Sequence, residues 1–534
     1  MQEPDAGGES EKSLRELIRD QLLARASEPV VCIANRWLTG QEILEGQQRY
    51  ARVLRGRGAK PGARVGVLLP NNEPFLLTWF ALLELNVTFV PVNINLMGES
   101  LRYIIKHADL DLLIVDDTAL PAYRDAFGER IPAGSLIVSG AAYLPGAENL
   151  QDLLATAVHE PIPDVPVGLS DPALIIYTSG TTGLPKGAVL SRAAQRAHAI
   201  YYAQDFVRLG HGETGYTCLP LFHVTAMGFS LGCLLGGARI VIDPRFGPFN
   251  FWAQIRKYNA QMFPYVGAMI GWLTGRPVRA NDRENPAVRA IGSATPLDLW
   301  ETFEQRFGLT LIETYGQTEL ASLWFMPPVG ERRIGSIGRP CDRMDARLEK
   351  ADGEAPHLGE IGEIVIRPHD PLLMAKTYFR DPDATKRAFR DGWYYTGDAG
   401  SLDQDRYFYF GGRLKDFIRR RGENIAAFEI EWEAISHPAV RECAAVGVPV
   451  ELGEEEIKLC VILEPEAILS ARELARYLRP RLAPFMQPRY IDLRADFPRT
   501  ATQRVQKFRL AQEGLPDGIW DRQRGARARA RKES

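Results

Sequence analysis

The chain is 534 residues long, has a formal net charge of −3, and is 45% hydrophobic and 25% charged. This length allows two domains with large cores, and the composition is that of a globular enzyme rather than of a disordered or fibrous protein. The small net charge argues against a nucleic-acid partner. We expect no membrane span, because Glu84 and Asn86 interrupt the most apolar stretch, residues 75–92.

The cysteines and the first residues of the chain both favour a cytoplasmic protein. The six cysteines form no CxxC pair, which is typical of reduced thiols. Residues 1–10 are acidic and contain glycines, unlike a signal peptide, and we expect them to be disordered. A homodimer is compatible with the sequence. The cysteines are Cys32, Cys218, Cys233, Cys341, Cys443 and Cys460.

Predicted strands and helices alternate along much of the chain. Apolar residues recur at helical spacing within residues 43–54. Because short apolar strands separated by helices are typical of parallel sheets with crossover helices, we predict an α/β fold. The strands are expected at residues 65–69, 87–91, 112–115, 240–242, 262–266, 290–293 and 311–314, and helices at 73–85, 100–108 and 297–307.

A loop rich in glycine and hydroxyl side chains follows a short apolar strand at residues 173–176. Ser191 is predicted to cap the next helix, so we expect the loop to join a strand to a helix. Inward-facing backbone N–H groups, hydroxyl donors and the charge of Lys186 would suit a phosphate. The loop is not a Walker A loop, because Gly187 follows the lysine. Its sequence is Tyr177-Thr178-Ser179-Gly180-Thr181-Thr182-Gly183-Leu184-Pro185-Lys186-Gly187.

This loop resembles the phosphate loop of the adenylate-forming superfamily. That group includes acyl- and aryl-CoA synthetases, peptide-synthetase adenylation domains and firefly luciferase. The resemblance extends over about residues 38–510, and the ending at residues 498–515 looks like that of carnitine- and crotonobetaine-CoA-ligase-like members. Further segments similar to superfamily motifs are Pro220-Leu221-Phe222-His223, Tyr315-Gly316-Gln317-Thr318-Glu319 and Gly392-Trp393-Tyr394-Tyr395-Thr396-Gly397-Asp398.

The resemblance implies a site for ATP and Mg²⁺. Tyr315 would stack on adenine, Asp398 would accept the ribose hydroxyls unless it only forms a turn, and Glu319 would bind the metal. The catalytic residues implied are Lys186, His223, Thr318, Glu319 and Arg504. The nucleotide-binding residues implied are Thr178, Ser179, Gly180, Thr181, Thr182, Ser293, Ala294, Glu313, Thr314, Tyr315, Gly316, Asp398 and Arg413.

The same resemblance implies a pocket for a carboxylic acid, although it does not identify the acid. His223 would border this pocket; a core histidine bonded to a backbone group is the alternative. The pocket residues implied are His223, Val224, Gly267, Thr295 and Ala321.

We predict three parts of the chain from the resemblance and from composition. A large N-terminal adenylating domain of mainly parallel sheets would occupy residues 1–412. A small, mobile C-terminal α/β lid would occupy residues 413–515, with Lys415 as the hinge and with Gly422 and Glu423 on the CoA side. The basic residues 516–534 would be a disordered tail. The arginines at 419–421 could instead form a solvated surface.

One residue departs from the superfamily pattern at a catalytic position. The superfamily has a lysine near the C-terminus that bridges the acid and the α-phosphate, and Arg504 stands in its place. Arginine keeps the charge but is bulkier. Alternatively, Lys507 could substitute from the same helical face, or the adenylation step could be altered.

The sequence therefore predicts an enzyme that activates a carboxylic acid with MgATP. The acid would form an acyl-AMP with release of pyrophosphate, and CoA would then accept the acyl group. The alternatives are another acceptor, such as an amine, a carrier-protein thiol or a small nucleophile like nitrite, and a non-catalytic nucleotide-binding scaffold.

Overall fold

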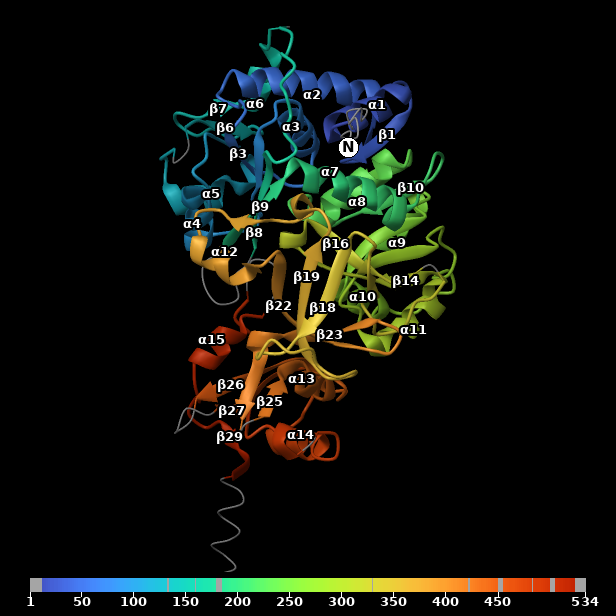
Figure 1. Ribbon diagram of the computed structural model, residues 1–534, viewed down its shortest axis with the longest axis vertical. Helices are drawn as coiled ribbons and strands as arrows, with labels where there is room; N and C mark the ends of the chain where they lie inside the picture. Colours follow the sequence, from blue (N-terminus) through green and yellow to red (C-terminus); the bar gives the residue numbers. More distant parts are fainter. Residues whose placement is uncertain are drawn as a thin grey trace, which may run out of the picture. The chain divides into compact units, whose positions relative to one another are not determined.

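The structure, a computed structural model, describes residues 12–131, 134–158, 160–178, 185–328, 330–420, 423–449, 455–482, 484–499 and 505–523 (Figure 1). The chain divides into two compact units. The first contains residues 1–178, 184–345 and 367–394, and the second contains residues 179–183, 346–366 and 395–534. The predicted α/β class is confirmed, with parallel-rich sheets in a large N-terminal part and a smaller C-terminal part. The boundary at residue 412 and the mobility of the lid stay predictions.

Two sheets form the framework of the first unit (Figure 1). One has the order β14 (Thr310–Glu313), β13 (Arg289–Ser293), β12 (Met262–Val266), β10 (Thr214–Thr217), β11 (Arg239–Ile242), β1 (Pro29–Ile33), β2 (Arg36–Thr39). The other has the order β20 (Thr377–Tyr378), β9 (Lys186–Ser191), β8 (Pro172–Thr178), β4 (Thr88–Pro91), β3 (Arg64–Leu68), β5 (Leu112–Asp116), β6 (Leu136–Ser139), β7 (Glu148–Asn149). Strands are parallel except at the β1–β2, β8–β9 and β9–β20 pairs. Every strand predicted for these sheets is present.

Helices connect these strands, as the alternation predicted. The helix predicted at residues 297–307 has those bounds, and Thr39 caps the helix whose apolar spacing was recognised. The helices are α1 (Leu14–Ala24), α2 (Gly40–Arg55), α3 (Glu73–Glu84), α4 (Gly98–Ala108), α5 (Leu120–Phe127), α6 (Leu150–Ala155), α7 (Arg192–Tyr201), α8 (Val224–Leu235), α9 (Phe251–Lys257), α10 (Gly267–Thr274), α11 (Leu297–Phe307) and α12 (Pro382–Ala388). Shorter turns are 3-10 helices at Asp117–Ala119, Thr318–Leu320 and Pro371–Leu373 and a π-helix at Tyr202–Val207.

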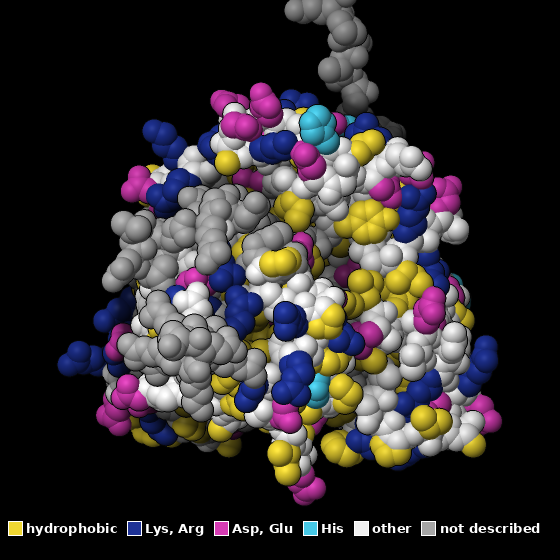
Figure 2. Space-filling view, turned by 90° about the horizontal axis from the view of Figure 1, so that it is seen from below, with side chains coloured by type: hydrophobic (Ala, Val, Ile, Leu, Met, Phe, Trp, Pro, Cys, Tyr) yellow, Lys and Arg dark blue, Asp and Glu magenta, His cyan; other side chains and the backbone are white. Residues whose placement is uncertain are grey.

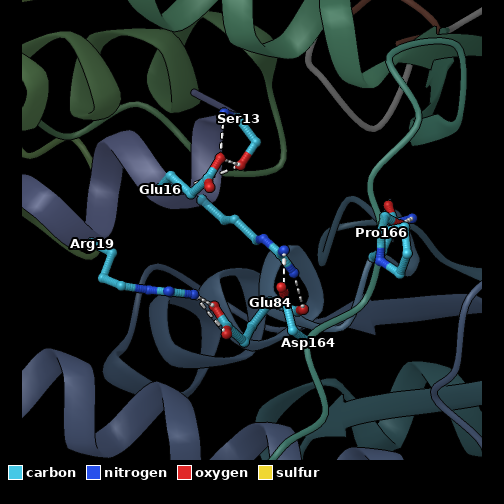
Figure 3. Close-up of polar contacts among 8 residues, drawn as sticks. Ser13, Glu16, Arg19, Glu84, Asp164 and Pro166 are labelled. Carbon is cyan, nitrogen blue, oxygen red and sulfur yellow. Dashed lines mark hydrogen bonds and ion pairs between the residues drawn. The ribbon is translucent and has the colours of Figure 1, made fainter. Parts of the chain in front are cut away.

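Charged side chains hold α1 against the rest of the first unit (Figure 3). Arg19 forms an ion pair with Glu84 of α3 at 3.0 Å. Arg15 donates to the carbonyl of Glu84 at 3.4 Å and to the carboxylate of Asp164 at 2.5 Å. The first helix is therefore tied both to α3 and to the segment that leads into β8.

Shorter strands complete the part of the chain before residue 413. One small sheet contains β15 (Tyr315–Gln317), β16 (Ser322–Met326) and β17 (Arg339–Pro340). Another has the order β18 (Met344–Glu349), β19 (Gly362–Pro368), β22 (Trp393–Leu402), β21 (Phe389–Arg390), and β23 (Phe408–Arg413) pairs with β22.

The C-terminal part of the second unit is built on one sheet with apolar residues on both faces. Its order is β26 (Val440–Pro449), β27 (Glu455–Leu463), β28 (Tyr490–Arg494), β29 (Trp520–Asp521). The prediction of a disordered tail from residue 516 is wrong at β29, because Trp520 packs on the core and pairs with Ile491. The other elements are 3-10 helices Leu414–Asp416 and Pro484–Met486, strands β24 (Phe417–Arg420) and β25 (Glu423–Ala426), and helices α13 (Ala427–Ile435), α14 (Ala471–Leu478) and α15 (Lys507–Gln512).

The described residues bear on the expectations of no membrane span and of a small net charge. No helix among the described residues has both the length and the apolar character needed to cross a bilayer. Figure 2 shows basic and acidic side chains interspersed over one face of the molecule, in keeping with the net charge of −3.

Candidate active site

The two strands that flank the glycine-rich loop lie antiparallel to each other. β8 ends at Thr178 and β9 begins at Lys186, and these two residues are opposite in the register. The expectation that the loop joins a strand directly to a helix is therefore wrong. The apolar residues 188–190 extend the sheet by one strand before Ser191 caps α7, which is the cap that the sequence predicted. The predicted loop residues Ser179, Gly180, Thr181 and Thr182 lie outside the described residues.

Two predicted catalytic residues from distant segments come together at Tyr378. The Tyr378 hydroxyl donates to Oε1 of Glu319 at 2.8 Å, and both side chains are buried. The Nζ atom of Lys186 lies 5.2 Å from the centre of the Tyr378 ring. Thr318, which precedes Glu319 in the short 3-10 helix, is partly exposed. Residues 377–379 resemble a short superfamily segment that suggested packing rather than chemistry, and the neighbouring residues give no signal of the side chain that the Tyr378 hydroxyl meets.

A buried carboxylate organises the turn after β13. Glu313 accepts hydrogen bonds from the backbone N–H of Ala294 (2.5 Å) and of Thr295 (3.2 Å). The hydroxyls of Thr295 and Tyr265 also donate to it. Burial raises the pKa of Glu313 above its ordinary value, and these donors oppose the rise. Glu313 thus fixes the turn at Ala294, whose φ of +63° is unusual for a residue with a side chain.

The predicted adenine-stacking residue lies on β15. Tyr315 is 6% exposed and packs edge-to-face on Phe325, with ring centres 5.3 Å apart. Gly316 follows it in the strand, and Thr314 donates through its hydroxyl to the carbonyl of Gly292 at 2.7 Å. The residue that precedes β15 is therefore bonded to β13, which places the predicted adenine-side residues Ser293, Ala294, Thr314 and Tyr315 in one region.

The predicted acid-pocket residues lie at the starts of two helices and at two turns, one of which is the turn after β13 that contains Thr295. His223 is exposed and stands at the N-terminus of α8, followed by Val224, so the alternative of a core histidine is wrong. Gly267 begins α10, and a Cβ there would lie 1.8 Å from the carbonyl oxygen of Ala294. This position therefore admits only glycine. Ala321 has a φ of +57° at the end of the 3-10 helix that carries Glu319.

The predicted ribose-binding pair lies in the second unit. Nε of Arg413 is 2.7 Å from Oδ1 of Asp398, whose side chain is only 2% exposed. The hydroxyl of Thr396 accepts from the backbone N–H of Asp398 at 3.0 Å. The Arg413 side chain is 38% exposed, so the positive member of the pair reaches the surface while the carboxylate is buried.

Several predicted residues near the C-terminus fall outside the described part of the chain. Gly422 and Arg504 are among them, as are the side chains of Lys415 and Glu423. Their roles stay predictions. The alternative that the arginines at 419–421 form a solvated surface is wrong at Arg420, because this side chain is 3% exposed and pairs with Glu456 at 2.8 Å.

The donor groups fit a magnesium ion carried by a nucleotide. Among the described residues, no three histidine, cysteine or carboxylate side chains gather as a ready-made metal site. Glu319 has one carboxylate oxygen bonded to Tyr378, and the second accepts no hydrogen bond from a described residue. Mg²⁺ usually takes one or two protein carboxylates and completes its shell with phosphate oxygens and water. Glu319 could hold the ion in that way.

Comparisons with known proteins identify the family of the chain. The AMP-binding enzyme family model matches residues 19–379, and the model of the AMP-binding enzyme C-terminal domain matches residues 429–504. A sulfoacetate–CoA ligase of Cupriavidus necator is 34% identical over 85% of this chain and 88% of its own. A crotonobetaine/carnitine–CoA ligase of Salmonella arizonae is 30% identical over 86% of this chain and 90% of its own.

Solved structures share the fold over nearly the whole chain. The anthranilate–CoA ligase AuaEII, in complex with anthranoyl-AMP, has a TM-score of 0.84 with 23% identity, over 94% of this chain and 97% of that one. ATP-bound MatB from Rhodopseudomonas palustris has a TM-score of 0.82 with 25% identity, over 94% of this chain and 99% of that one. The chain therefore belongs to the AMP-binding enzyme family, within the adenylate-forming superfamily.

Proposed function

We propose that this chain is an AMP-forming acid–CoA ligase. It activates a carboxylic acid with ATP, releases pyrophosphate, and passes the acyl group from acyl-AMP to CoA. The observation that carries this proposal is the meeting of Lys186 and Glu319 at Tyr378, within a chain whose relatives are named CoA ligases. A reaction between two anions requires positive charge at the site, which Lys186 supplies directly and Glu319 would supply by holding Mg²⁺.

Each of the proposed catalytic residues has its own role in the first half-reaction, the formation of acyl-AMP. A carboxylate oxygen of the acid attacks the α-phosphorus of ATP, and pyrophosphate leaves from the opposite side. Lys186 offsets the negative charge of the phosphates, and Thr318 offers them a hydroxyl. Mg²⁺ on Glu319 would neutralise part of the phosphate charge. Arg504 would bridge the two anions, as the superfamily lysine does.

Nucleotide recognition falls to two groups of residues. The face of Tyr315 and the backbone at Ser293 and Ala294 hold the adenine, and the turn fixed by Glu313 keeps that backbone in place. Asp398 accepts the ribose hydroxyls while Arg413 holds the carboxylate. These roles predict that Asp398→Asn raises the KM for ATP more than it lowers kcat.

We propose that the acid is small. The relatives at 30% and 34% identity are named for crotonobetaine, carnitine and sulfoacetate, which are all small acids. The exposed His223 at the start of α8 would face the acid. The cytoplasmic location and a homodimer stay proposals.

The test is a pyrophosphate-release screen over short-chain, aryl and long-chain acids, followed by mass spectrometry of the product with CoA. We expect release with at least one small acid and a CoA thioester of that acid. Pyrophosphate release without a CoA thioester, but with an amide, a carrier-bound acyl group or a nitrite adduct, would show that the acceptor is an amine, a carrier-protein thiol or nitrite instead of CoA. A folded protein that releases no pyrophosphate with any acid would overturn the proposal.

A further inference from the structure

Tyr378 is a single side chain that touches both the predicted metal-binding carboxylate and the predicted phosphate-binding lysine. Its hydroxyl donates to Oε1 of Glu319 at 2.8 Å, and the Nζ of Lys186 lies over its ring, 5.2 Å from the ring centre. Tyr378 is 7% exposed and Glu319 is 8% exposed. A buried carboxylate needs hydrogen-bond donors, and this hydroxyl is a donor supplied from a different segment of the chain.

The backbone around Tyr378 is fixed to the same two elements. Tyr378 pairs with Ala188 in the antiparallel β9–β20 ladder, and the N–H of Phe379 donates to the carbonyl of Gly187 at 2.7 Å. On the other side, the N–H of Ala375 donates to the backbone carbonyl of Glu319 at 2.7 Å. The backbone of this segment therefore bridges the strand that carries Lys186 and the turn that carries Glu319.

We propose that Tyr378 is a positioning residue for adenylation, a role that rests on the proposed function. Its hydroxyl holds Oε1 of Glu319 so that the second carboxylate oxygen faces the nucleotide-bound metal ion. Its ring holds the ammonium group of Lys186 by a cation–π contact, which limits the directions that this flexible side chain can take. One residue thus sets the relative placement of the two charges that act on the phosphates.

The two contacts can be separated by substitution. Tyr378→Phe removes the hydroxyl and keeps the ring, so it should affect the carboxylate and spare the lysine. The residue packs near Phe389, with ring centres 5.8 Å apart, so a purely structural role would show only as lost stability. Tyr123→Phe is a matched control, because Tyr123 is a buried tyrosine of the same unit whose hydroxyl donates to the carbonyl of Arg130, away from the site.

The experiment measures binding of Mn²⁺, as a paramagnetic substitute for Mg²⁺, in the presence of a non-hydrolysable ATP analogue. We expect Tyr378→Phe to weaken Mn²⁺ binding by about tenfold to a hundredfold, as for the loss of one hydrogen bond to a charged group, and Tyr123→Phe to leave it unchanged. Binding of the analogue without metal should be the same in all three proteins. Thermal unfolding of each protein separates this effect from a loss of stability.

A double-mutant cycle with Glu319→Gln decides whether Tyr378 acts through the carboxylate. If it does, Tyr378→Phe has no further effect on metal binding once Glu319 is replaced. The proposal is overturned if Tyr378→Phe lowers the unfolding temperature but binds Mn²⁺ like the wild type, or if the two substitutions weaken binding independently. Because this readout needs no acid or CoA, failure of the proposed function would appear separately, as absent turnover with normal nucleotide and metal binding.

Discussion

The Nζ of Lys507 lies 2.7 Å from Oε1 and 3.0 Å from Oε2 of Glu431, so the first residue of α15 is bound to the middle of α13. Asp416 adds a second carboxylate 3.8 Å away, and the N–H of Ala445 donates to the same glutamate at 2.6 Å. Lys507 thus serves as the cation of a partly buried charge cluster within the second unit. This engagement argues against Lys507 as a substitute for the superfamily lysine.

Lys507→Ala should therefore reduce stability more than it reduces adenylation. Removing the cation leaves the Glu431 carboxylate without its charge partner, which we expect to cost about 1 to 3 kcal/mol of unfolding free energy. Urea unfolding measures this loss, and ATP–pyrophosphate exchange under native conditions measures catalysis. A variant of normal stability with a large loss of exchange would show that Lys507 acts in the chemistry.

The stability deficit of Lys507→Ala should depend on pH. Burial raises the pKa of Glu431, and the charge of Lys507 opposes the rise, so removing the lysine raises that pKa further. Burial lowers the pKa of Lys507, but Glu431 and Asp416 outweigh it and raise the pKa above 10.5. Titration of Lys507 itself therefore removes the stabilisation by the lysine only as the pH rises above 10.5 through the folded-state pKa, whereas protonation of Glu431 reduces it in acid.

The titration of Glu431 sets how the unfolding free energy of the Lys507→Ala variant depends on pH. A glutamate with a raised folded-state pKa binds its proton more tightly in the folded state, so acid favours folding of the variant. The difference in unfolding free energy between wild type and variant should be largest near about pH 8 and smaller near about pH 5. Urea unfolding at both pH values measures this difference. A difference that is larger near about pH 5 than near about pH 8 would contradict the pairing of Lys507 with Glu431.

Arg504 is the residue that we expect to supply the catalytic cation. Arg504→Ala should lower ATP–pyrophosphate exchange by about tenfold to a thousandfold, as for the loss of a positioned charge, whereas Lys507→Ala should lower it much less. Arg504→Lys serves as the matched variant, because it restores the superfamily residue and should retain most of the exchange. A larger loss at Lys507 than at Arg504, in two folded proteins, would reverse the assignment.

Glu319→Gln should abolish most adenylation while the protein stays folded. Glutamine keeps a side-chain oxygen that can accept from Tyr378, but it loses the charge that attracts the metal, and we expect a loss of at least about a hundredfold. Glu349→Gln is a control, because Glu349 accepts from Tyr395 in a similar tyrosine–glutamate pair outside the site. Near-normal pyrophosphate exchange by folded Glu319→Gln would remove Glu319 from the site.

Local patterns in the sequence were sufficient to predict the parallel sheets. The strand at residues 262–266 and the helix at residues 297–307 were placed without error, because apolar runs and periodicity depend on nearby residues. The strand between the glycine-rich loop and α7 was missed. Its short apolar run, residues 188–190, fits a strand and the start of a helix equally well. Only the pairing with β8 decides for the strand.

The candidate site was predicted from residue types, but its connections were not. Glu319 and Lys186 could be named from their motifs, whereas the link through Tyr378 depends on β20 returning to pair with β9, a contact far apart in sequence. The burial of Arg420 was missed for the same reason, since its partner Glu456 lies on β27. Partners at long range are set by the topology of the sheets.

Transfer of an oxygen atom from the acid to AMP tests the proposed acyl-AMP route most directly. When the acid is labelled with oxygen-18 in its carboxylate and incubated with the enzyme, ATP, Mg²⁺ and CoA, the attacking oxygen becomes the bridge of acyl-AMP. It stays with phosphorus when the CoA thiol displaces AMP from the acyl carbon. We predict one labelled oxygen in AMP and none in pyrophosphate. Release of ADP with label in inorganic phosphate would contradict the acyl-AMP route and, with it, the proposed function.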